Sequence, residues 1–288
     1  MSMAASDENG ENTYIIDTES AAEMARLIDQ SRSMNEAMGS LLPENIDLSG
    51  VQSILDVACG PGEWVQEVAA FYPHIKFVGT DISTLMIKYA MQRARIQKLA
   101  NASFQVMDAR TPLEFANEAF DLVNARFMAA FLPRHEWPQV IKDFARVTRA
   151  GGTIVLTETD IFAPGDTNSP AIEELNGLCR EAVYRAGLYT STGTRLTTIM
   201  DQFLLEAGCQ DIQKKWHTLD FSAGTAAHPV IYSNLSFAFK LVQPFLLKMV
   251  QTTQEQLDEL YERGMQEMMR DDFHGKTQFL RAWGIKSA

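Results

Sequence analysis

The chain has 288 residues, of which 46% are hydrophobic and 22% charged, a composition typical of a globular protein with a large buried core. Its 37 acidic and 25 basic side chains give a formal net charge of -12, which argues against a nucleic-acid partner, because nucleic-acid binding depends on a local excess of lysine and arginine. The polar, acidic leader predicts no signal or transit peptide, and we expect no apolar run long enough to span a membrane. Cys59, Cys179 and Cys209 lack metal-site or disulfide spacing, so we predict a cytoplasmic protein without a metal ion.

The first 50 residues are predicted to form a polar leader followed by a helix. Apolar residues recur at helical spacing from Glu19 to Met38. Asp17 or Thr18 is the expected N-cap, and Gly39 is the expected stop. We therefore separate residues 1–50 from the domain that follows.

From residue 51, short apolar runs alternate with helix-length segments. Strands are expected at 51–58, 75–81, 102–109, 119–126 and 153–160, and helices at 63–72, 83–100 and 136–152, with Ser83 as an N-cap and Gly151 closing the last helix. This alternation predicts an α/β fold, with a parallel sheet covered by helices on both faces. Residues 171–187, 196–208, 228–250 and 254–270 are further expected helices, and 213–222 and 273–286 are expected strands. We predict one domain, 51–288, with helical additions at about 165–192 and 226–270.

The turn Cys59-Gly60-Pro61-Gly62 follows the first expected strand, where open parallel sheets bind ligands. Glycine lets the backbone turn tightly and approach a ligand closely. A dinucleotide-binding turn would carry a third glycine where Val65 stands, which argues against a nicotinamide cofactor. Asp56, just before the turn, would repel a pyrophosphate and attract a cation.

Two further acids follow the next two expected strands. Asp81 ends the second strand, where a carboxylate can accept hydrogen bonds from both ribose hydroxyls of an adenosine. Asp108 ends the third strand, where it can accept from the amino group of adenine, because an ionised acid only accepts. Three acids in this order around one glycine turn predict a cofactor site.

These motifs resemble those of class I S-adenosylmethionine-dependent methyltransferases, close to bacterial small-molecule enzymes of the ubiquinone/menaquinone C-methyltransferase type. The resemblance is carried by the segments "LDVACGPG", "VGTDIS", "VMDA", "FDLVNARF" and "VTRAGGTIVLTE", between Ile54 and Asp160. Ala58 stands where the family usually has its first glycine, so we expect a slightly altered turn that still binds the cofactor.

The resemblance implies a Rossmann-like, doubly wound sheet of seven mostly parallel strands with an antiparallel last strand. It implies S-adenosyl-L-methionine as the cofactor and S-adenosyl-L-homocysteine as the product. By motif match, the cofactor-binding residues are Asp56, Ala58, Cys59, Gly60 and Gly62 for the methionine part, Asp81 and Ile82 for the ribose, Asp108 and Ala109 for the adenine, and Arg126 and Phe127 at the floor. In similar enzymes the N-terminal segment covers the cofactor, which makes Tyr14 and Gln30 candidate lid contacts.

Methyl transfer is an in-line displacement that needs alignment of the reactants and exclusion of water, but no obligatory acid. Candidate bases are His217, Glu158, Tyr184, Tyr189, His228 and Tyr232, and the last five are also the predicted substrate-pocket residues. The stretch after the fourth strand, Asn124 to Phe127, lacks the Pro-Pro tetrad of amino-methylating nucleic-acid enzymes.

The predicted function is methyl transfer to a small, apolar acceptor of natural-product or quinone type. The apolar residues 228–250 could wall its pocket, form a homo-oligomer interface, or pack in the core. Two alternatives stay open: a nicotinamide-dependent oxidoreductase and a non-catalytic S-adenosylmethionine-binding subunit. The sequence does not determine the acceptor, the methylated atom or the oligomeric state.

Overall fold

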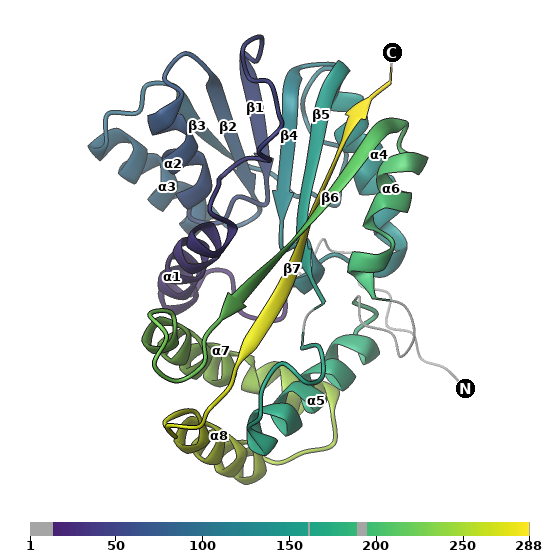
Figure 1. The fold of residues 1–288 in the computed structure, drawn as a ribbon. Coiled ribbons are helices and arrows are strands. Elements are labelled where there is room, and N and C mark those ends of the chain that lie inside the picture. The colour runs from purple at the N-terminus through teal and green to yellow at the C-terminus, as the bar shows by residue number, and fades with distance from the viewer. Residues whose placement is uncertain (1–13, 161, 189–194, 288) are drawn as a thin grey trace.

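A single sheet forms the centre of the computed structural model, which describes residues 14–160, 162–188 and 195–287. Its seven strands lie in the order β3-β2-β1-β4-β5-β7-β6 (Figure 1). Strands β1 to β5 pair in parallel, and β7 lies antiparallel between β5 and β6. This confirms the predicted mostly parallel sheet with an antiparallel last strand. The strands are β1 (Ser53–Val57), β2 (Lys76–Asp81), β3 (Ala102–Val106), β4 (Phe120–Arg126), β5 (Thr148–Thr159), β6 (Cys209–Asp220) and β7 (Lys276–Lys286).

Helices cover both faces of the sheet and its carboxyl edge. The α-helices are α1 (Ala21–Met38), α2 (Glu63–Phe71), α3 (Thr84–Ile96), α4 (Trp137–Val147), α5 (Pro170–Arg185), α6 (Met200–Glu206), α7 (His228–Met249) and α8 (Gln254–Met268). Short 3-10 turns lie at Met128–Ala130, Arg134–Glu136 and Leu196–Thr198.

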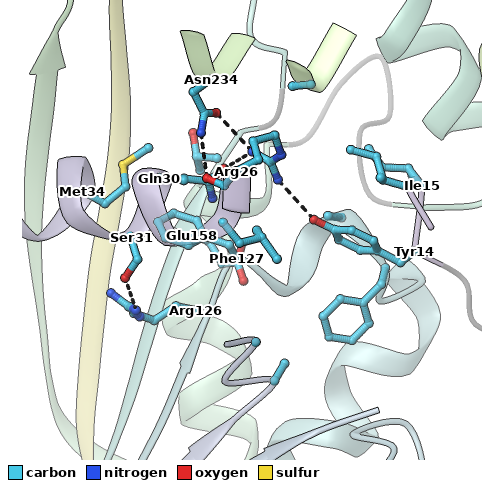
Figure 2. Close-up of a pocket in the computed structure, with 18 of the residues that line it drawn as sticks. Tyr14, Ile15, Arg26, Gln30, Ser31, Met34, Arg126, Phe127, Glu158 and Asn234 are labelled. Atoms are coloured by element: carbon cyan, nitrogen blue, oxygen red, sulfur yellow. Dashed lines mark hydrogen bonds between the residues drawn. The ribbon is translucent and has the colours of Figure 1, made fainter. Parts of the chain in front are cut away.

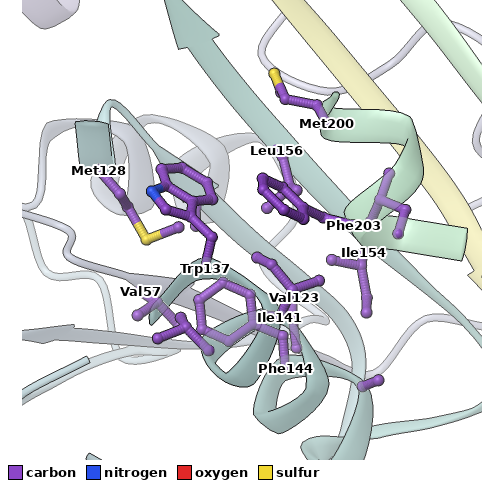
Figure 3. Close-up of a cluster of buried hydrophobic side chains, with 14 of the residues drawn as sticks. Val57, Val123, Met128, Trp137, Ile141, Phe144, Ile154, Leu156, Met200 and Phe203 are labelled. Carbon is purple, nitrogen blue, oxygen red and sulfur yellow. The ribbon is translucent and has the colours of Figure 1, made fainter. Parts of the chain in front are cut away.

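The two faces of the sheet bury separate cores, because successive side chains of a strand point to opposite faces. Leu55 of β1 packs in the core shared with α4 and α6, whereas its neighbour Ile54 packs in the core shared with α2 and α3. In the first core, the rings of Trp137 and Phe203 stack with their centroids 5.8 Å apart (Figure 3). Both cores hold the sheet rigid beneath its carboxyl edge.

The order of the strands reverses at β1, which pairs with β2 on one side and β4 on the other. The connections that follow β1 and β4 therefore leave toward opposite faces of the sheet. Such a switch point opens a crevice beyond the carboxyl ends of the strands, where ligands bind in open α/β sheets. The glycine turn after β1 lies at this crevice.

Helices α1, α5, α7 and α8 form a layer beyond the carboxyl edge of the sheet (Figure 1). α7 packs against α1, α5 and α8, and α5 packs against α8. α5 falls within the addition expected at 165–192, and α7 and α8 within the one at 226–270. The layer thus joins the N-terminal helix to both predicted additions.

The predicted start of α1 and the predicted end of α4 were wrong. α1 is capped by Ser20, whose hydroxyl accepts the Glu23 N–H, because Asp17 instead accepts the Glu19 N–H in a local turn. The helix expected to reach Gly151 ends before Thr148, which begins β5 and donates its hydroxyl to Phe144 O at 2.6 Å. A β-branched residue that satisfies a terminal carbonyl ends the helix early. The stop at Gly39 and the N-cap at Ser83 are confirmed.

We expected no apolar run as long as a membrane span, and α7 shows that this expectation was wrong. It is the one helix in the described part of the chain that is long and apolar enough for a span, judged by length and composition only. A third of its most apolar window (33%) is buried, and the helix packs against three others. The core helix of a soluble protein can have the same length and composition, so these two properties are weak evidence for a membrane-spanning helix.

Candidate functional site

A cavity of about 380 Å³ lies beyond the carboxyl ends of β1, β2, β4 and β5 (Figure 2). One part of its lining comes from the turn after β1 and the ends of β2 and β3, and includes the predicted cofactor residues Asp56, Ala58, Cys59, Gly60, Asp81, Ile82, Asp108 and Ala109. The other part comes from α5, α7 and β6, and is mostly apolar: Ile172, Leu219, Phe221, Ile231, Leu235, Ala238, Phe239 and Val242. Such a size and composition are typical of small-ligand sites.

The turn after β1 contains three residues in the left-handed region, with φ of 56° at Ala58, 55° at Gly60 and 78° at Gly62. A Cβ at Gly62 would lie 2.7 Å from the Phe104 ring and 2.9 Å from the Ala90 Cβ. Gly62 does not line the cavity. The close packing of the start of α2 on β3 and α3 therefore requires a glycine at position 62. Contact with a ligand does not require it.

Replacing Ala58 by glycine is expected to raise the free energy of unfolding by about 1 kcal/mol. A Cβ in the left-handed region costs about 1–2 kcal/mol, and the greater freedom of glycine in the unfolded chain offsets part of the gain. Urea denaturation of the two proteins measures the difference. A less stable Ala58→Gly variant would show that the core contacts of the alanine methyl group outweigh its backbone strain.

Asp56 is buried near the end of β1, with 3% of its surface exposed. Its Oδ1 accepts a hydrogen bond from Asn124 Nδ2 at 2.7 Å. Burial raises the pKa of Asp56 to about 6, although the nearby guanidinium of Arg126 and the Asn124 bond oppose this shift. A desolvated carboxylate of this kind favours a cationic ligand, which would replace the lost hydration.

Asp81 ends β2 and is held by the turn it faces. Its Oδ2 accepts the N–H of Gly60 at 2.8 Å, and its Oδ1 accepts the N–H of Ser83 at 2.9 Å. Burial nevertheless raises the pKa of Asp81, and the two backbone bonds oppose the rise. An ionised carboxylate has about four acceptor sites, so both oxygens can still accept bonds from a ligand.

Asp108 and Ala109 lie in the loop after β3, which ends at Val106, earlier than expected. The Oδ1 of Asp108 accepts the backbone N–H of Arg110 at 2.8 Å. The side chain of Arg110 pairs with Glu136 at 2.8 Å. These local bonds fix the loop at the edge of the cavity.

Arg126 ends β4 and links the strand edge to α1. Its Nη1 donates to Asn35 Oδ1 at 2.9 Å. Its Nη2 donates to Ser31 Oγ at 3.3 Å (Figure 2). The guanidinium also lies over the Trp64 ring, 5.8 Å from its centroid. Burial lowers the pKa of Arg126, whereas the carboxylate of Asp56 opposes this change. Opposite charges thus stand side by side at the turn.

The predicted lid residues Tyr14 and Gln30 both line the cavity, within a buried polar cluster. The Arg26 guanidinium donates to Glu23 at 2.6 Å and to Gln30 Oε1 at 2.5 Å. It also donates to Asn234 Oδ1 of α7 at 3.2 Å (Figure 2). The Tyr14 hydroxyl donates to Glu23 at 2.8 Å. Glu23, Arg26 and Asn234 were not predicted, although the spacing of three and four residues places Glu23, Arg26 and Gln30 on one helix face. Nothing in the sequence indicates Asn234.

The segment around α1 is also fixed at its two ends. The Ser83 hydroxyl and the Leu85 N–H both donate to the carboxylate of Glu19, at 2.7 and 3.3 Å. Beyond α1, the buried Arg281 of β7 donates to Ser40 O at 3.0 Å. The N-terminal segment is therefore docked on the sheet domain and forms one side of the cavity.

Among the predicted substrate-pocket residues, Glu158 lines the cavity, together with the predicted floor residues Arg126 and Phe127. Tyr184 is 55% exposed and lies outside the lining, and Tyr232 packs in the core of the helical layer. Tyr189 lies outside the described residues. Helical periodicity locates such residues on a helix but does not say which face meets a cavity.

The two histidine candidates also lie outside the lining. The Nε2 of His228 forms a hydrogen bond with Met268 O at 2.9 Å. His217 stacks on Phe279 with the ring centroids 5.5 Å apart, and burial lowers its pKa to about 4. Both pack in the helical layer or the sheet, outside the cavity lining, so neither is positioned to act as a base.

Polar residues that the sequence did not single out line the second part of the cavity: Asp160, Asp166, Thr167, Asn176 and Thr277. Asp160 accepts the hydroxyl of Thr197 at 2.6 Å. Burial raises the pKa of Asp166 to about 6. Within the described parts of the chain, no group of three His, Cys, Asp or Glu side chains could hold a metal ion.

Comparisons with known proteins find sequence similarity to methyltransferases. Residues 54–152 match a family model described as a methyltransferase domain. The chain is 28% identical over 163 residues to the methyltransferase GfsG of Streptomyces halstedii, which covers 55% of each chain. It is 32% identical over 114 residues to a demethylmenaquinone methyltransferase of Lactococcus lactis, covering 39% of this chain and 44% of that one. The match thus spans about half, or less, of these relatives.

Solved structures resemble most of the fold at low sequence identity. Phosphoethanolamine N-methyltransferase 2 of Haemonchus contortus, in complex with S-adenosyl-L-methionine, matches with a TM-score of 0.53 and 20% identity, covering 88% of this chain and 53% of that one. The YcgJ protein of Bacillus subtilis matches with a TM-score of 0.52 and 19% identity, covering 83% and 93%. At this identity the likeness establishes the fold.

Proposed function

We propose that this chain is a class I S-adenosylmethionine-dependent methyltransferase, which binds S-adenosylmethionine at the turn after β1 and methylates a small, apolar acceptor of natural-product or quinone type. One observation carries the proposal: Asp56, Asp81 and Asp108, at or just after the ends of three neighbouring strands, line a cavity whose other part is apolar. The relatives, named as a methyltransferase and a demethylmenaquinone methyltransferase, support the same class of reaction.

The residues around the turn fit this cofactor by their chemistry. Asp56 would hold the methionine ammonium group, and the neighbouring Arg126 would hold its carboxylate. The two oxygens of Asp81 would accept the ribose hydroxyls, and Asp108 would accept the adenine amino group. The anionic and cationic side chains thus match the zwitterionic and polar parts of one molecule.

The bound cofactor would supply a methyl group on a positively charged sulfur, ready for displacement by a nucleophile. The chain itself would contribute alignment and a dry site. α1 and α7 line the cavity and are joined through the Arg26–Asn234 bond. The apolar side chains of α7 would orient the acceptor, because they offer contact area without competing hydrogen bonds.

The turn disfavours the nicotinamide alternative. Dinucleotide-binding turns offer free backbone N–H groups to a pyrophosphate. Here the Gly60 N–H donates to Asp81 and the Gly62 N–H donates to Cys59 O at 3.1 Å. The carboxylates of Asp56 and Asp81 would also repel the phosphates.

Calorimetric titration with S-adenosylhomocysteine, and with NADH as the control, tests the proposal. We expect micromolar binding of the first and none of the second. Binding of NADH alone would refute the proposed cofactor. The non-catalytic alternative predicts binding of S-adenosylhomocysteine without turnover of S-adenosylmethionine against any panel of apolar acceptors.

The affinity for S-adenosylhomocysteine is expected to fall as the pH drops below about 6, by up to about tenfold per pH unit. The ligand's ammonium group favours the ionised form of Asp56, and protonation of the free carboxyl, whose pKa is about 6, competes with binding. Titrations between about pH 5 and 7.5 measure this dependence. The Asp56→Asn variant should bind more weakly at neutral pH and lose the dependence. An equal slope in both proteins would assign it to another group.

A further inference from the structure

We propose that Glu158 is the proton acceptor of the reaction, and that the methylated molecule presents an acidic hydroxyl group, of phenol or enol type, in the apolar part of the cavity. This inference rests on the proposed function and adds to it a catalytic residue and a class of nucleophile.

Glu158 lies near the end of β5 and lines the cavity, although only 1% of its surface is exposed. It stands against the segment that follows β4, close to Phe127 (Figure 2). Its Oε1 accepts the N–H of Met128 at 2.6 Å, and its Oε2 accepts the N–H of Ala129 at 3.4 Å. These two bonds orient the carboxylate and leave about half of its acceptor sites for a ligand.

The charges around Glu158 do not neutralise it. Asp160, which directly follows the same strand, adds a like charge. The guanidinium of Arg126 on β4 is directed to Asn35 of α1, and that of Arg281 on β7 to Ser40. Within the described residues, Glu158 has no ion-pair partner. A buried carboxylate without a cation is costly, and such groups concentrate at functional sites.

The pKa of Glu158 also suits a base that takes the proton of an acidic hydroxyl group. Burial raises the pKa of Glu158 to about 8, although the two backbone donors oppose the shift. A proton transfers readily between groups of similar acidity. The pKa of a phenol, about 10 as in tyrosine, is within reach of such a base, whereas an alkyl alcohol is far less acidic. An acidic hydroxyl is therefore the matching nucleophile.

The proposed step balances without a further reactant. The hydroxyl O–H bond breaks, and its proton passes to a carboxylate oxygen of Glu158. The electron pair left on the acceptor oxygen forms the new bond to the methyl carbon. The bond from that carbon to sulfur breaks and its electron pair stays on sulfur, which loses its positive charge. Glu158 then releases the proton to water.

Two naphthalene probes test this assignment: 2-naphthol, an acidic hydroxyl, and 2-naphthylmethanol, an alcohol on the same ring. The proteins are the unaltered chain, Glu158→Gln, Glu158→Asp and, as a remote control, Glu262→Gln on the exposed side of α8. Formation of S-adenosylhomocysteine from S-adenosylmethionine is followed between about pH 6 and 9.5, a range that brackets the pKa of Glu158. Calorimetry gives each protein's Kd for S-adenosylhomocysteine, and thermal unfolding reports its fold.

We expect methylation of 2-naphthol at a rate that rises with pH and levels off above about 8, because the ionised base is the active form. Glu158→Gln should lower kcat by about 100-fold or more and abolish this inflection, with the Kd for S-adenosylhomocysteine within about twofold. Glu158→Asp should recover part of the rate, and Glu262→Gln should match the unaltered chain.

Three results would overturn the assignment. The first is an unchanged rate and pH profile in Glu158→Gln. The second is methylation of 2-naphthylmethanol as fast as 2-naphthol, or of neither probe by a protein that binds S-adenosylhomocysteine. The third is a parallel loss of S-adenosylhomocysteine affinity and thermal stability in Glu158→Gln, the mark of a structural role. Failure of the unaltered chain to bind S-adenosylhomocysteine would instead overturn the proposed function.

Discussion

Replacing Asp81 by alanine is expected to weaken the binding of S-adenosylhomocysteine by about 10- to 150-fold, equivalent to about 1.5–3 kcal/mol. The loss would come from the acceptors for the ribose hydroxyls. It would also come from the turn, because Asp81 holds the N–H groups of Gly60 and Ser83. Calorimetry of the variant and of the exposed control Asp271→Ala measures the change.

The variant Asp81→Asn separates these two contributions. An asparagine keeps one carbonyl oxygen, but its amide group cannot accept from a backbone N–H. We expect an intermediate affinity, with most of the stability of the unaltered chain. An affinity equal to that of the unaltered chain in Asp81→Ala would show that the cofactor binds away from the end of β2.

The sheet and the glycine turn could be predicted because their signals are local. Alternating strand and helix runs imply parallel crossovers, and the carboxyl ends of parallel strands share one edge. The sequence therefore predicts that Asp56, Asp81 and Asp108 lie close together, and all three line the cavity. The antiparallel pairing of β7 could be predicted only from the family resemblance, because no local pattern in the residues of β7 indicates its neighbours in the sheet.

The second part of the cavity could not be predicted, because it depends on which faces of separate helices meet. α7 is apolar around most of its circumference, so its periodicity does not distinguish Phe239, which lines the cavity, from the exposed Phe237. The Arg26–Asn234 bond joins residues far apart in the chain. Tertiary packing selects such pairs, and no motif marks them.

Replacing Gly62 by alanine is expected to lower the free energy of unfolding by about 3 kcal/mol, the sum of backbone strain and overpacking. The left-handed backbone at φ 78° disfavours any Cβ, and the new methyl group would also lie 2.7 Å from the Phe104 ring. The core cannot expand to admit it, because α2, α3 and β3 are closely packed there. Urea denaturation of the variant measures the loss.

Gly151→Ala is the matched control for this strain. Gly151 has a similar φ of 74°, but a Cβ there would meet no atom within 4 Å. Its substitution should cost only the backbone term, about 1–2 kcal/mol. The difference between the two variants gives the packing term at Gly62, and Phe104→Leu in the Gly62→Ala background should recover part of it. Equal losses in the two single variants would mean that the turn after β1 has room for a side chain, and that conformation alone selects its second glycine.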